Sequence, residues 1–333
     1  MKKIVAILCA LTMVFALAAC GSSASTAPAA TAAPAAEPAA EGASYSVGIC
    51  QLVQHPALDA ATQGFKDALT AALGDSVTFT EQNASGDSAT CATICNQFVS
   101  DEVDLIMANA TPALLAAQAA TGSIPILGTS VTDYASALGI DDWSGATGIN
   151  ISGTSDGAPA DQLAGVVNEL FPDAKNVGLL YCSGEPNSLF QADEIRPVLE
   201  GMGYTVTDYT FADSNDVAAV TNTACDENDV LYIPTDNTAA SNAELINNVA
   251  LNKQVPIVAG EEGLCSGCGV ATLSISYYDL GTVTGQMAAQ ILSEGADVSA
   301  MEIQYAPFAK KYNAANCEAL GIEVPAAYEA IEG

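Results

Sequence analysis

Short apolar runs alternate with longer stretches of helical spacing over most of the chain. The first half contains the runs YSVGICQLV (45–53), SVTFTEQN (76–83), VDLIMANA (103–110) and IPILGTSV (124–131). After the first run, apolar residues recur near the helical interval from Ala57 through Phe65 to Leu73. Uninterrupted apolar strands that are joined by helices are typical of a parallel sheet covered on both faces. The pattern therefore predicts an α/β fold.

The second half of the chain repeats this plan. Its runs are NVGLLYCSG (176–184), YTVTDYTFA (204–212), VLYIPTDN (230–237) and VPIVAGEEG (255–263). The interval from Val47 to Val103 nearly equals that from Val177 to Val230, which indicates an internal duplication. We therefore predict two doubly wound parallel-sheet lobes joined by a hinge. The first lobe would comprise residues 44–152 plus about 277–300, and the second 153–276 plus about 301–333.

The N-terminal segment has the features of a secretion signal. Two lysines precede an uncharged apolar stretch, which ends in Leu17-Ala18-Ala19-Cys20. This ending resembles the lipobox of bacterial lipoproteins. The resemblance implies a signal peptide over residues 1–20 and lipidation of Cys20, with plain secretion as the alternative. Residues 21–43 are mostly Ala, Pro and Ser, so we expect a disordered tether between the lipid and the folded body.

The composition narrows the classes of partner and of site. The formal net charge is −31 at pH 7, which disfavours nucleic acids and anionic lipid surfaces as partners. Cys265 and Cys268 form a C-x-x-C pattern in what we interpret as a glycine-rich turn, either as a local disulfide or as two free thiols. A zinc site would need further ligands, and His55 is the only histidine. We expect no metal and no cofactor.

Polar loops follow the predicted strands of both halves. In open parallel sheets ligands lie beyond the carboxyl ends of the strands, so two sheets that face each other at those ends enclose one cleft. The helices after these loops point their N-termini into the same space. No G-x-S-x-G, P-loop or G-x-G-x-x-G motif occurs at a strand–helix junction. We expect a binding protein rather than an enzyme, with His55 either in the cleft or in a structural role.

The loops carry groups that suit a small zwitterion. Hydroxyl donors for a carboxylate come from Thr111, Ser130, Thr132 and Ser188. An ammonium group could be held by Asp236 or Glu185 through charge-assisted hydrogen bonds. Groups that both donate and accept come from Asn83, Asn187 and Asn237. For each of these residues, capping of a helix N-terminus is an equally good explanation.

Aromatic residues near the loops are few. Tyr277 and Tyr278 follow the last predicted strand of the second half and could stack on a ring. As neighbouring strand residues, one would face inward and the other outward. Trp143, in DDWSGATG, precedes the passage to the second lobe, and we expect it in a surface loop rather than stacked on a ligand.

In order along the chain, QLVQHPALDAATQGFKDAL, NASGD, ATP, PTDN, AGEEG and SISYYDLGTVTGQMA resemble a known family, the substrate-binding lipoproteins of ABC transporters. The best-described members bind tryptophan and other aromatic amino acids, and the likeness runs from about Tyr45 to Pro325. It implies the type I periplasmic-binding fold with three hinge strands, and a permease and an ATPase as partners. The segment GLCSGCG departs from the longer polar stretch usual in the family, which leaves the solute open.

The resemblance also implies ligand-binding positions: Gln51, His55, Thr111, Ser130, Thr132, Asn187, Ser188, Thr235, Asp236 and Asn237. In related amino-acid receptors, a Ser/Thr pair of the first lobe takes the ligand carboxylate and an acid of the second lobe takes the ammonium. In this chain the resemblance implies that Asp236 binds the ammonium group and that Thr111, Ser130 and Thr132 bind the carboxylate.

We therefore expect a monomeric, lipid-anchored, extracytoplasmic receptor of an ABC importer. It would bind an amino acid with an aromatic or apolar side chain by closing its hinge, because contacts from both lobes exist only in the closed state. A sugar or nucleoside receptor of the same fold is one alternative, and it would show clearer stacking aromatics in the first-lobe loops. A ligand sensor that is not coupled to transport is the other.

Overall fold

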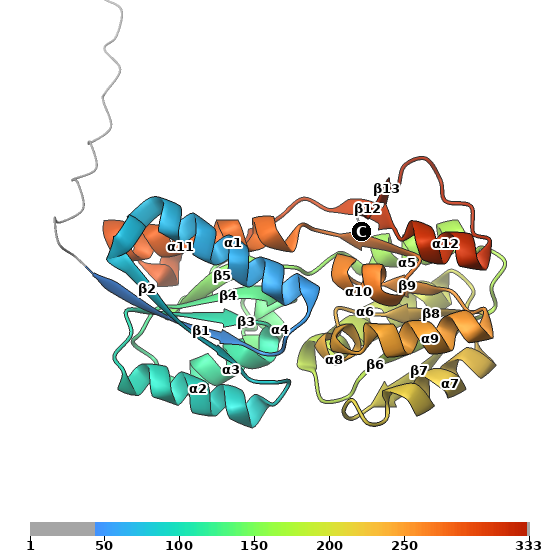
Figure 1. Cartoon of the computed structure of the whole chain (residues 1–333), viewed down its shortest axis with the longest axis horizontal. Helices are drawn as coiled ribbons and strands as arrows, with labels where there is room; N and C mark the ends of the chain where they lie inside the picture. The colour runs from blue at the N-terminus through green and yellow to red at the C-terminus, as the bar shows by residue number, and fades with distance from the viewer. Residues whose placement is uncertain (1–43, 332–333) are drawn as a thin grey trace, which may run out of the picture. The chain divides into compact units, whose positions relative to one another are not determined.

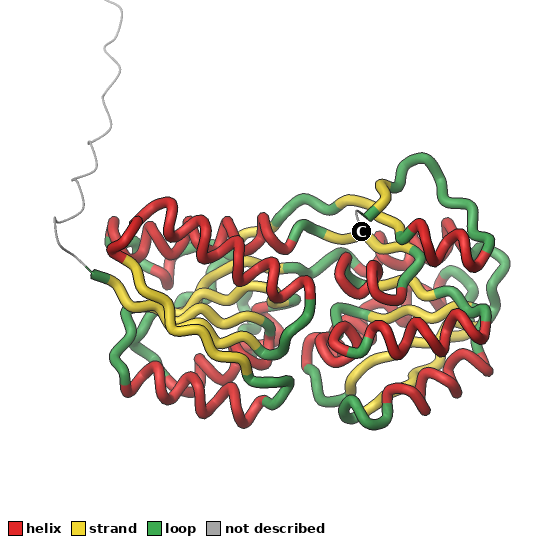
Figure 2. The backbone as a smooth tube through the Cα atoms, viewed as in Figure 1, coloured by secondary structure: helices red, strands yellow, loops and turns green. Residues whose placement is uncertain are grey.

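The computed structural model describes residues 44–331. The predicted signal peptide, the predicted lipidation site Cys20 and the predicted tether all lie outside the described residues. Within this range the chain forms two β-sheets, each with helices on both faces (Figures 1 and 2). No helix of residues 44–331 combines the length and the apolar character that crossing a membrane requires.

The first sheet has six strands in the order β11-β5-β4-β3-β1-β2, and every neighbouring pair is parallel. Its strands are β1 (Tyr45–Gln51), β2 (Val77–Asn83), β3 (Leu105–Asn109), β4 (Ile126–Val131), β5 (Ile151–Ser155) and β11 (Gln304–Tyr305). The predicted apolar runs thus became buried strands, since side chains on both faces are covered.

Successive residues of these strands serve two separate cores. Ile49 and Met107 pack with Phe65 beneath one pair of helices, whereas their neighbours Cys50 and Ala108 join the core on the opposite face. The first pair is α1 (Pro56–Leu73) and α11 (Tyr277–Glu294), which lie side by side (Figure 1). The other face carries α2 (Ser88–Ser100) and α3 (Thr111–Ala120). The remaining helical segments are η1 (Gly74–Ser76), α4 (Tyr134–Leu138) and η2 (Val298–Ala300).

The second sheet has seven strands in the order β13-β12-β10-β9-β8-β6-β7. They are β6 (Asn176–Cys182), β7 (Thr205–Phe211), β8 (Val230–Ile233), β9 (Ile257–Ala259), β10 (Ala271–Ser274), β12 (Ala309–Tyr312) and β13 (Glu329–Ala330). Only the β10–β12 pair is antiparallel among these described strands. The order β9-β8-β6-β7 matches β4-β3-β1-β2 of the first sheet, as the repeated sequence plan predicts.

Helices again cover both faces of the second sheet (Figure 2). One core includes residues of α5 (Ala160–Leu170), α6 (Pro186–Gly201) and α12 (Ala314–Leu320). The other includes residues of α7 (Val217–Glu227), α8 (Asn237–Ser241), α9 (Ala243–Lys253) and α10 (Glu262–Cys268). The predicted α/β class with two doubly wound lobes is confirmed.

The chain passes between the two sheets three times: after β5, after β10 and after β11. The predicted division assigned residues 153–155 and about 301–333 to the second lobe. In the structure β5 continues to Ser155, and Gln304 and Tyr305 pair with it in the first sheet. The first and the third passage therefore fall a few residues later than the division placed them, because backbone pairing decides where a lobe ends.

Two local interpretations of the sequence were wrong. Tyr277 and Tyr278 begin helix α11, because the Ser276 side chain accepts from the backbone N–H of Asp279 and caps a new helix. The segment GLCSGC lies within helix α10 rather than in a turn, because the Glu261 carboxylate caps its first N–H groups. The eight cysteines of the described residues, Cys265 and Cys268 among them, are buried free thiols.

Candidate functional site

One cavity lies between the loops that follow the strands of both sheets. The first lobe contributes His55, Leu58, Ser130, Thr132 and Asp156. The second contributes Asn187, Thr235, Asp236, Asn237, Ala240 and Glu261, and Tyr277 at the start of α11 completes the lining. Seven of the ten predicted ligand-binding residues therefore line the same cavity, although their loops are far apart in the sequence.

Direct hydrogen bonds join the two lobes around this cavity. The Thr132 hydroxyl lies 3.1 Å from the Thr235 hydroxyl and accepts a bond of 3.1 Å from Gln191 Nε2. The ring Nε2 of His55 lies 3.2 Å from the side-chain oxygen of Asn237. The cavity that remains has a volume of about 10 Å³, so a ligand enters it only when the lobes separate.

Buried polar atoms without a protein partner gather in this cavity. Among the described residues, eight buried side-chain atoms lack such a partner. Four of them line the cavity: His55 Nδ1, Ser130 Oγ, Asp156 Oδ1 and Asn187 Oδ1. A fifth, Thr111 Oγ1, borders the adjoining pocket that Asn187 also lines. Each unmade hydrogen bond costs about 1–3 kcal/mol, so their concentration makes this cavity the candidate site for a polar ligand.

Asp156 is the acid that the sequence analysis missed. It directly follows β5, where the chain first leaves the first lobe, and its side chain is buried. Its Oδ2 accepts a hydrogen bond of 2.7 Å from the Tyr277 hydroxyl, whereas its Oδ1 has no protein partner. Burial raises the pKa of Asp156, and the bond from Tyr277 opposes this shift. An ionised Asp156 therefore needs a positive partner, and one of its oxygens is available for it.

Glu261 adds a second buried carboxyl beside Asp156. It follows β9 and accepts hydrogen bonds from the backbone N–H groups of Gly263, at 2.5 Å, and of Leu264. Its pKa is raised to about 7: burial is the main cause, the two N–H groups oppose the shift, and the charge of the nearby Asp156 adds to it. Two carboxyls that repel each other favour a cation between or beside them.

Asp236, the predicted ammonium ligand, is already hydrogen-bonded within its own lobe. Its Oδ1 accepts from Ala239 N at 2.7 Å, and its Oδ2 accepts from Cys182 N at 2.6 Å and Ser188 Oγ at 2.7 Å. Burial, and secondly the neighbouring Glu185, raise its pKa to about 8. Asp236 borders the cavity, but its oxygens hold helix α8 and the end of β6 in place.

Glu185 is occupied in the same way. Its Oε2 accepts from the backbone N–H of Asn237 at 3.0 Å, and its Oε1 accepts from the N–H and the hydroxyl of Thr238, each at 2.8 Å. These bonds fix the N-terminal turn of α8 against the loop after β6. Both acids that the sequence suggested for the ammonium group thus serve the architecture of the second lobe.

The first lobe presents hydroxyl groups from strained backbone. The pairing of β4 with β5 shifts register between Gly128 and Val131, and Ser130 within this irregularity has φ of +55°. Ala110, directly before α3, has φ of +90°. Positive φ is unfavourable for residues with a side chain and persists where the surroundings enforce it, often at functional sites. Ser130 lines the cavity, and its buried hydroxyl has no protein partner.

His55 precedes α1, but its side chain does not cap the helix. Burial lowers the pKa of His55, and the bond with Asn237 opposes the shift, so the ring is neutral at physiological pH. A neutral ring that donates from Nε2 to the Asn237 oxygen carries an acceptor at Nδ1. That nitrogen has no protein partner, so the cavity gains an acceptor here.

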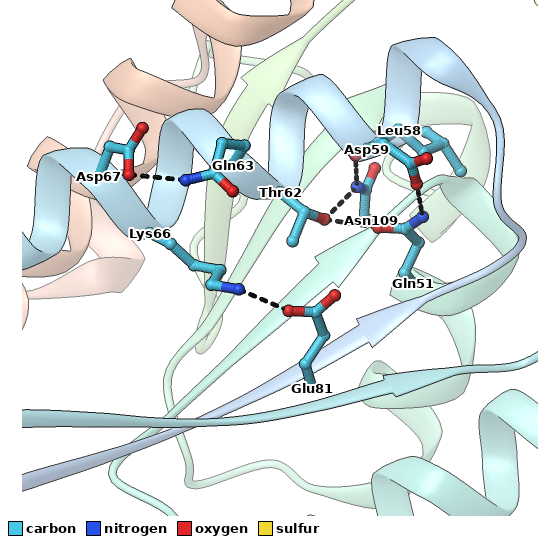
Figure 3. A network of polar contacts seen from close by, with 9 residues as sticks. All are labelled: Gln51, Leu58, Asp59, Thr62, Gln63, Lys66, Asp67, Glu81 and Asn109. Carbon is cyan, nitrogen blue, oxygen red and sulfur yellow. Dashed lines mark hydrogen bonds and ion pairs between the residues drawn. The ribbon is translucent and has the colours of Figure 1, made fainter.

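Besides Thr111, two predicted residues do not line the cavity. Gln51 turns under helix α1, where it donates to Asp59 at 2.7 Å and accepts from Thr62 at 2.6 Å (Figure 3). Asn109 reaches the same Thr62 from β3. Ser188 is fully buried and donates to Asp236. Gln51 thus fixes helix α1, and Ser188 fixes the Asp236 carboxylate that borders the cavity.

Comparison with known proteins identifies the family of this chain. The ABC transporter substrate binding protein family matches residues 46–327. The chain belongs to this family. It is therefore an extracytoplasmic, solute-binding receptor of an ABC importer, with permease and ATPase subunits as its partners. The family is a class of receptors and not of enzymes, and the resemblance found in the sequence is confirmed.

Individual relatives of this receptor carry more specific names. A tyrosine-binding protein of Clostridioides difficile (strain R20291) is 38% identical over 256 residues, which cover 76% of this chain and 74% of the relative. An ABC domain of Streptococcus pneumonia, solved in complex with L-Trp, is 29% identical with a TM-score of 0.82, and the match covers 87% of this receptor and 100% of that chain. A ligand-free, open substrate-binding protein of Clostridium difficile is 35% identical with a TM-score of 0.65, over 86% and 99% of the two chains.

Proposed function

We propose that this receptor binds a free aromatic amino acid, of the kind represented by tyrosine and tryptophan, in the cavity around Asp156. The ammonium group of the ligand would pair with Asp156 Oδ1. Its carboxylate would accept from the Ser130 hydroxyl, and from Thr111 at the N-terminus of α3, where the helix dipole favours an anion. His55 Nδ1 would accept a second ammonium proton.

The observation that carries this proposal is the unpartnered Asp156 oxygen in a cavity that also holds an unpartnered serine hydroxyl. A buried carboxylate costs several kcal/mol unless a positive charge compensates it, and an ammonium group supplies that charge. A neutral sugar or nucleoside would leave it uncompensated. The aromatic side chain is inferred from the tyrosine-binding relative and from the L-Trp complex.

Asp156 replaces Asp236 as the proposed ammonium ligand. Asp236 receives three hydrogen bonds from its own lobe, whereas one oxygen of Asp156 receives none from the protein. Thr132 keeps a place in the site through its position on the cavity wall, and Thr235, Asn187 and Asn237 face it from the second lobe. Their roles are to close the cavity around the ligand.

Isothermal titration with tyrosine, tyramine and 3-(4-hydroxyphenyl)propionate tests this assignment. Tyramine lacks the carboxylate and the propionate lacks the ammonium group, so both should bind far more weakly than tyrosine. In Asp156→Asn the loss of a charge-assisted hydrogen bond of about 1.5–3 kcal/mol should weaken tyrosine binding roughly 10- to 150-fold. The exposed Asp161→Asn is the matched control and should bind as the wild type does. Equal affinities of Asp156→Asn and wild type for tyrosine would refute the role of Asp156.

We also propose that Cys20 anchors the receptor to the outer face of the membrane and that the receptor is a monomer. The lipobox-like Leu17-Ala18-Ala19-Cys20 supports the anchor. Metabolic labelling with a radioactive fatty acid should mark the wild type, and Cys20→Ala should abolish the label. Sedimentation of the folded body should give the mass of one chain; a dimer would contradict the second part.

A further inference from the structure

We call the cavity around Asp156 the polar cavity. A second pocket adjoins it, and we call this second pocket the lateral pocket. Its walls include Trp143, Tyr305, Leu163, Phe190 and Ile195. Trp143 and Tyr305 come from the first lobe, whereas Leu163, Phe190 and Ile195 come from helices α5 and α6 of the second. Like the cavity around Asp156, it is therefore formed by both lobes.

The lateral pocket borders the proposed amino-acid site. Thr132 lines both spaces. On the hinge segment, Asp156 faces the polar cavity, while its neighbours Ser155 and Gly157 line the lateral pocket. At this border Thr132 contacts Gln191 and Thr235, and these contacts are side-chain hydrogen bonds that rotamer changes can open.

Of the two spaces that Thr132 lines, only the lateral pocket has room for an aromatic ring. The polar cavity measures about 10 Å³, whereas the lateral pocket measures about 290 Å³. A pocket of about 200 Å³ on another side of the cavity is bordered by Glu185, Asp213 and Ser214, so it offers a ring charged and polar walls. The lateral pocket instead offers apolar and aromatic ones, against which a ring can pack or stack.

The exposure of its aromatic residues also indicates that the lateral pocket is a binding site. Trp143 is 36% exposed and Tyr305 is 60% exposed. They are two of the three aromatic residues among the exposed large hydrophobic residues of the described chain. Exposed aromatic faces gathered at one concave place are typical of a binding site rather than of ordinary surface. Asp133 and Glu194 at its border add negative charge, which disfavours an acidic side chain.

We propose that the lateral pocket receives the side chain of the bound amino acid, and that Phe190 and Trp143 determine the preference for an aromatic ring. This inference rests on the proposed function, since the ligand's ammonium group at Asp156 sets the point from which the side chain extends. The side chain passes Thr132, and ring packing replaces the contact of Thr132 with Gln191. Trp143 thereby gains a stacking role that the sequence did not indicate.

The only tryptophan of the chain gives a direct test without any mutation. Under excitation selective for tryptophan, saturation of the wild type with phenylalanine should change the emission of Trp143, because the ring comes to lie against the indole. Saturation with alanine, which has the same ammonium and carboxylate groups, should change it far less. Equal emission changes with the two ligands, or none with either at saturation measured by calorimetry, would overturn the inference.

Substitutions give the second test. Phe190→Ala should weaken tyrosine and tryptophan binding by about tenfold or more, since a hydrophobic pocket gains this much from even one or two methylenes, and should leave the Kd for alanine unchanged. Leu189→Ala, at the exposed neighbouring position of α6, is the matched control. If Phe190→Ala weakens alanine and tyrosine equally, or weakens neither, the lateral pocket does not hold the side chain. If the wild type binds no amino acid at all, the proposed function fails instead.

Phe190 also borders a pocket near Thr111 and Leu115, of about 260 Å³. Trp143 does not line that pocket, so Trp143→Ala separates the two locations. The inference requires Trp143→Ala to weaken tyrosine binding selectively, as Phe190→Ala does. A selective loss in Phe190→Ala that is absent in Trp143→Ala would place the ring near Leu115 and overturn the assignment.

Discussion

The hydroxyl oxygens of Thr132 and Thr235 lie 3.1 Å apart although the two residues belong to different lobes. Thr132 follows β4 and Thr235 follows β8, so the contact joins the carboxyl edges of two sheets that the chain builds separately. Gln191 hydrogen-bonds to both hydroxyls and completes a three-residue bridge. Polar contacts thus link the loops at the carboxyl edges of the two sheets.

We predict that this bridge sets the balance between open and closed lobes. Thr132→Val and Thr235→Val keep the side-chain shape and remove the hydroxyls, so each should shift the receptor toward the open form. A double-mutant cycle should give a coupling free energy of about 0.5–1.5 kcal/mol, the net worth of one hydrogen bond. The measurement is the closed fraction from fluorescence energy transfer between dyes on the two lobes. Thr93→Val, on the exposed face of α2, is the control, and strict additivity of the two variants would contradict the bridge.

A second prediction separates the roles of the two aspartates at the cavity. Asp236→Asn should lower the free energy of unfolding by about 1–3 kcal/mol, because it weakens the cap of α8 and the bonds to Cys182 and Ser188. Asp156→Asn should leave the free energy of unfolding unchanged or raise it, since it removes a buried charge and keeps an acceptor for Tyr277. Urea denaturation measures both. The reverse result, with Asp236→Asn stable but unable to bind tyrosine, would restore Asp236 as the ammonium ligand.

These two aspartates show how far the sequence could predict the site. Asp236 lies in PTDN, one of the duplicated post-strand loops, so the repeat directed attention to it. Asp156 directly follows β5 at the hinge, outside the duplicated anchors. The strand before it, ISGTS, is mostly polar, so no apolar run indicated a post-strand loop there. Which of the two keeps a free oxygen depends on Ser188, Cys182 and Tyr277, and those contacts arise only in the folded chain.

The fold was more predictable than the direction of single side chains. Continuous apolar runs such as LIMAN became strands because both faces of a parallel sheet are buried. The position of Gln51 at the end of β1 suggested a cleft residue, yet its amide turns to Asp59 and Thr62 of the next helix (Figure 3). Periodicity reports which face of an element is buried, but not which neighbour a polar side chain selects.

Stability should fall as pH rises from about 5 to 8, because the folded state raises the pKa of Glu261 to about 7 and that of Asp236 to about 8. A carboxyl whose pKa is higher when folded binds its proton more tightly in the folded chain. Its contribution is therefore complete below the ordinary pKa of a carboxyl and is lost as pH rises through the folded value. Urea denaturation at intervals of pH measures the slope.

The same slope identifies the responsible groups. Glu261→Gln should flatten it, whereas Glu244→Gln, on the exposed face of α9, should not. The amino acid should also bind more tightly as pH rises through the raised pKa of Asp156, since its ammonium group pairs with the ionised carboxylate. Binding should then release protons in calorimetry with two buffers. A stability that increases with pH in the wild type would contradict the buried protonated carboxyls.

The close approach of α1 and α11 leads to the last prediction. A Cβ on Gly281 would lie 1.9 Å from the carbonyl oxygen of Ala61, and one on Gly64 would lie 2.1 Å from that of Tyr278. Backbone atoms cannot yield as the end of a side chain can, so the two helices would have to separate. Gly281→Ala should therefore lower the free energy of unfolding by about 2 kcal/mol or more, as overpacking of a tight core does.

Gly165 in α5 provides the matched control, since a Cβ there would meet no atom within 4 Å. Gly165→Ala should stabilise the receptor by about 0.5–1 kcal/mol through helix propensity and a less flexible unfolded chain. Because α11 begins with Tyr277, which donates to Asp156 at the hinge, Gly281→Ala should also weaken tyrosine binding, and Gly165→Ala should not. Thermal denaturation and calorimetry of the two variants measure both effects. Equal stability of Gly281→Ala and wild type would show that the two helices are not fixed at this distance.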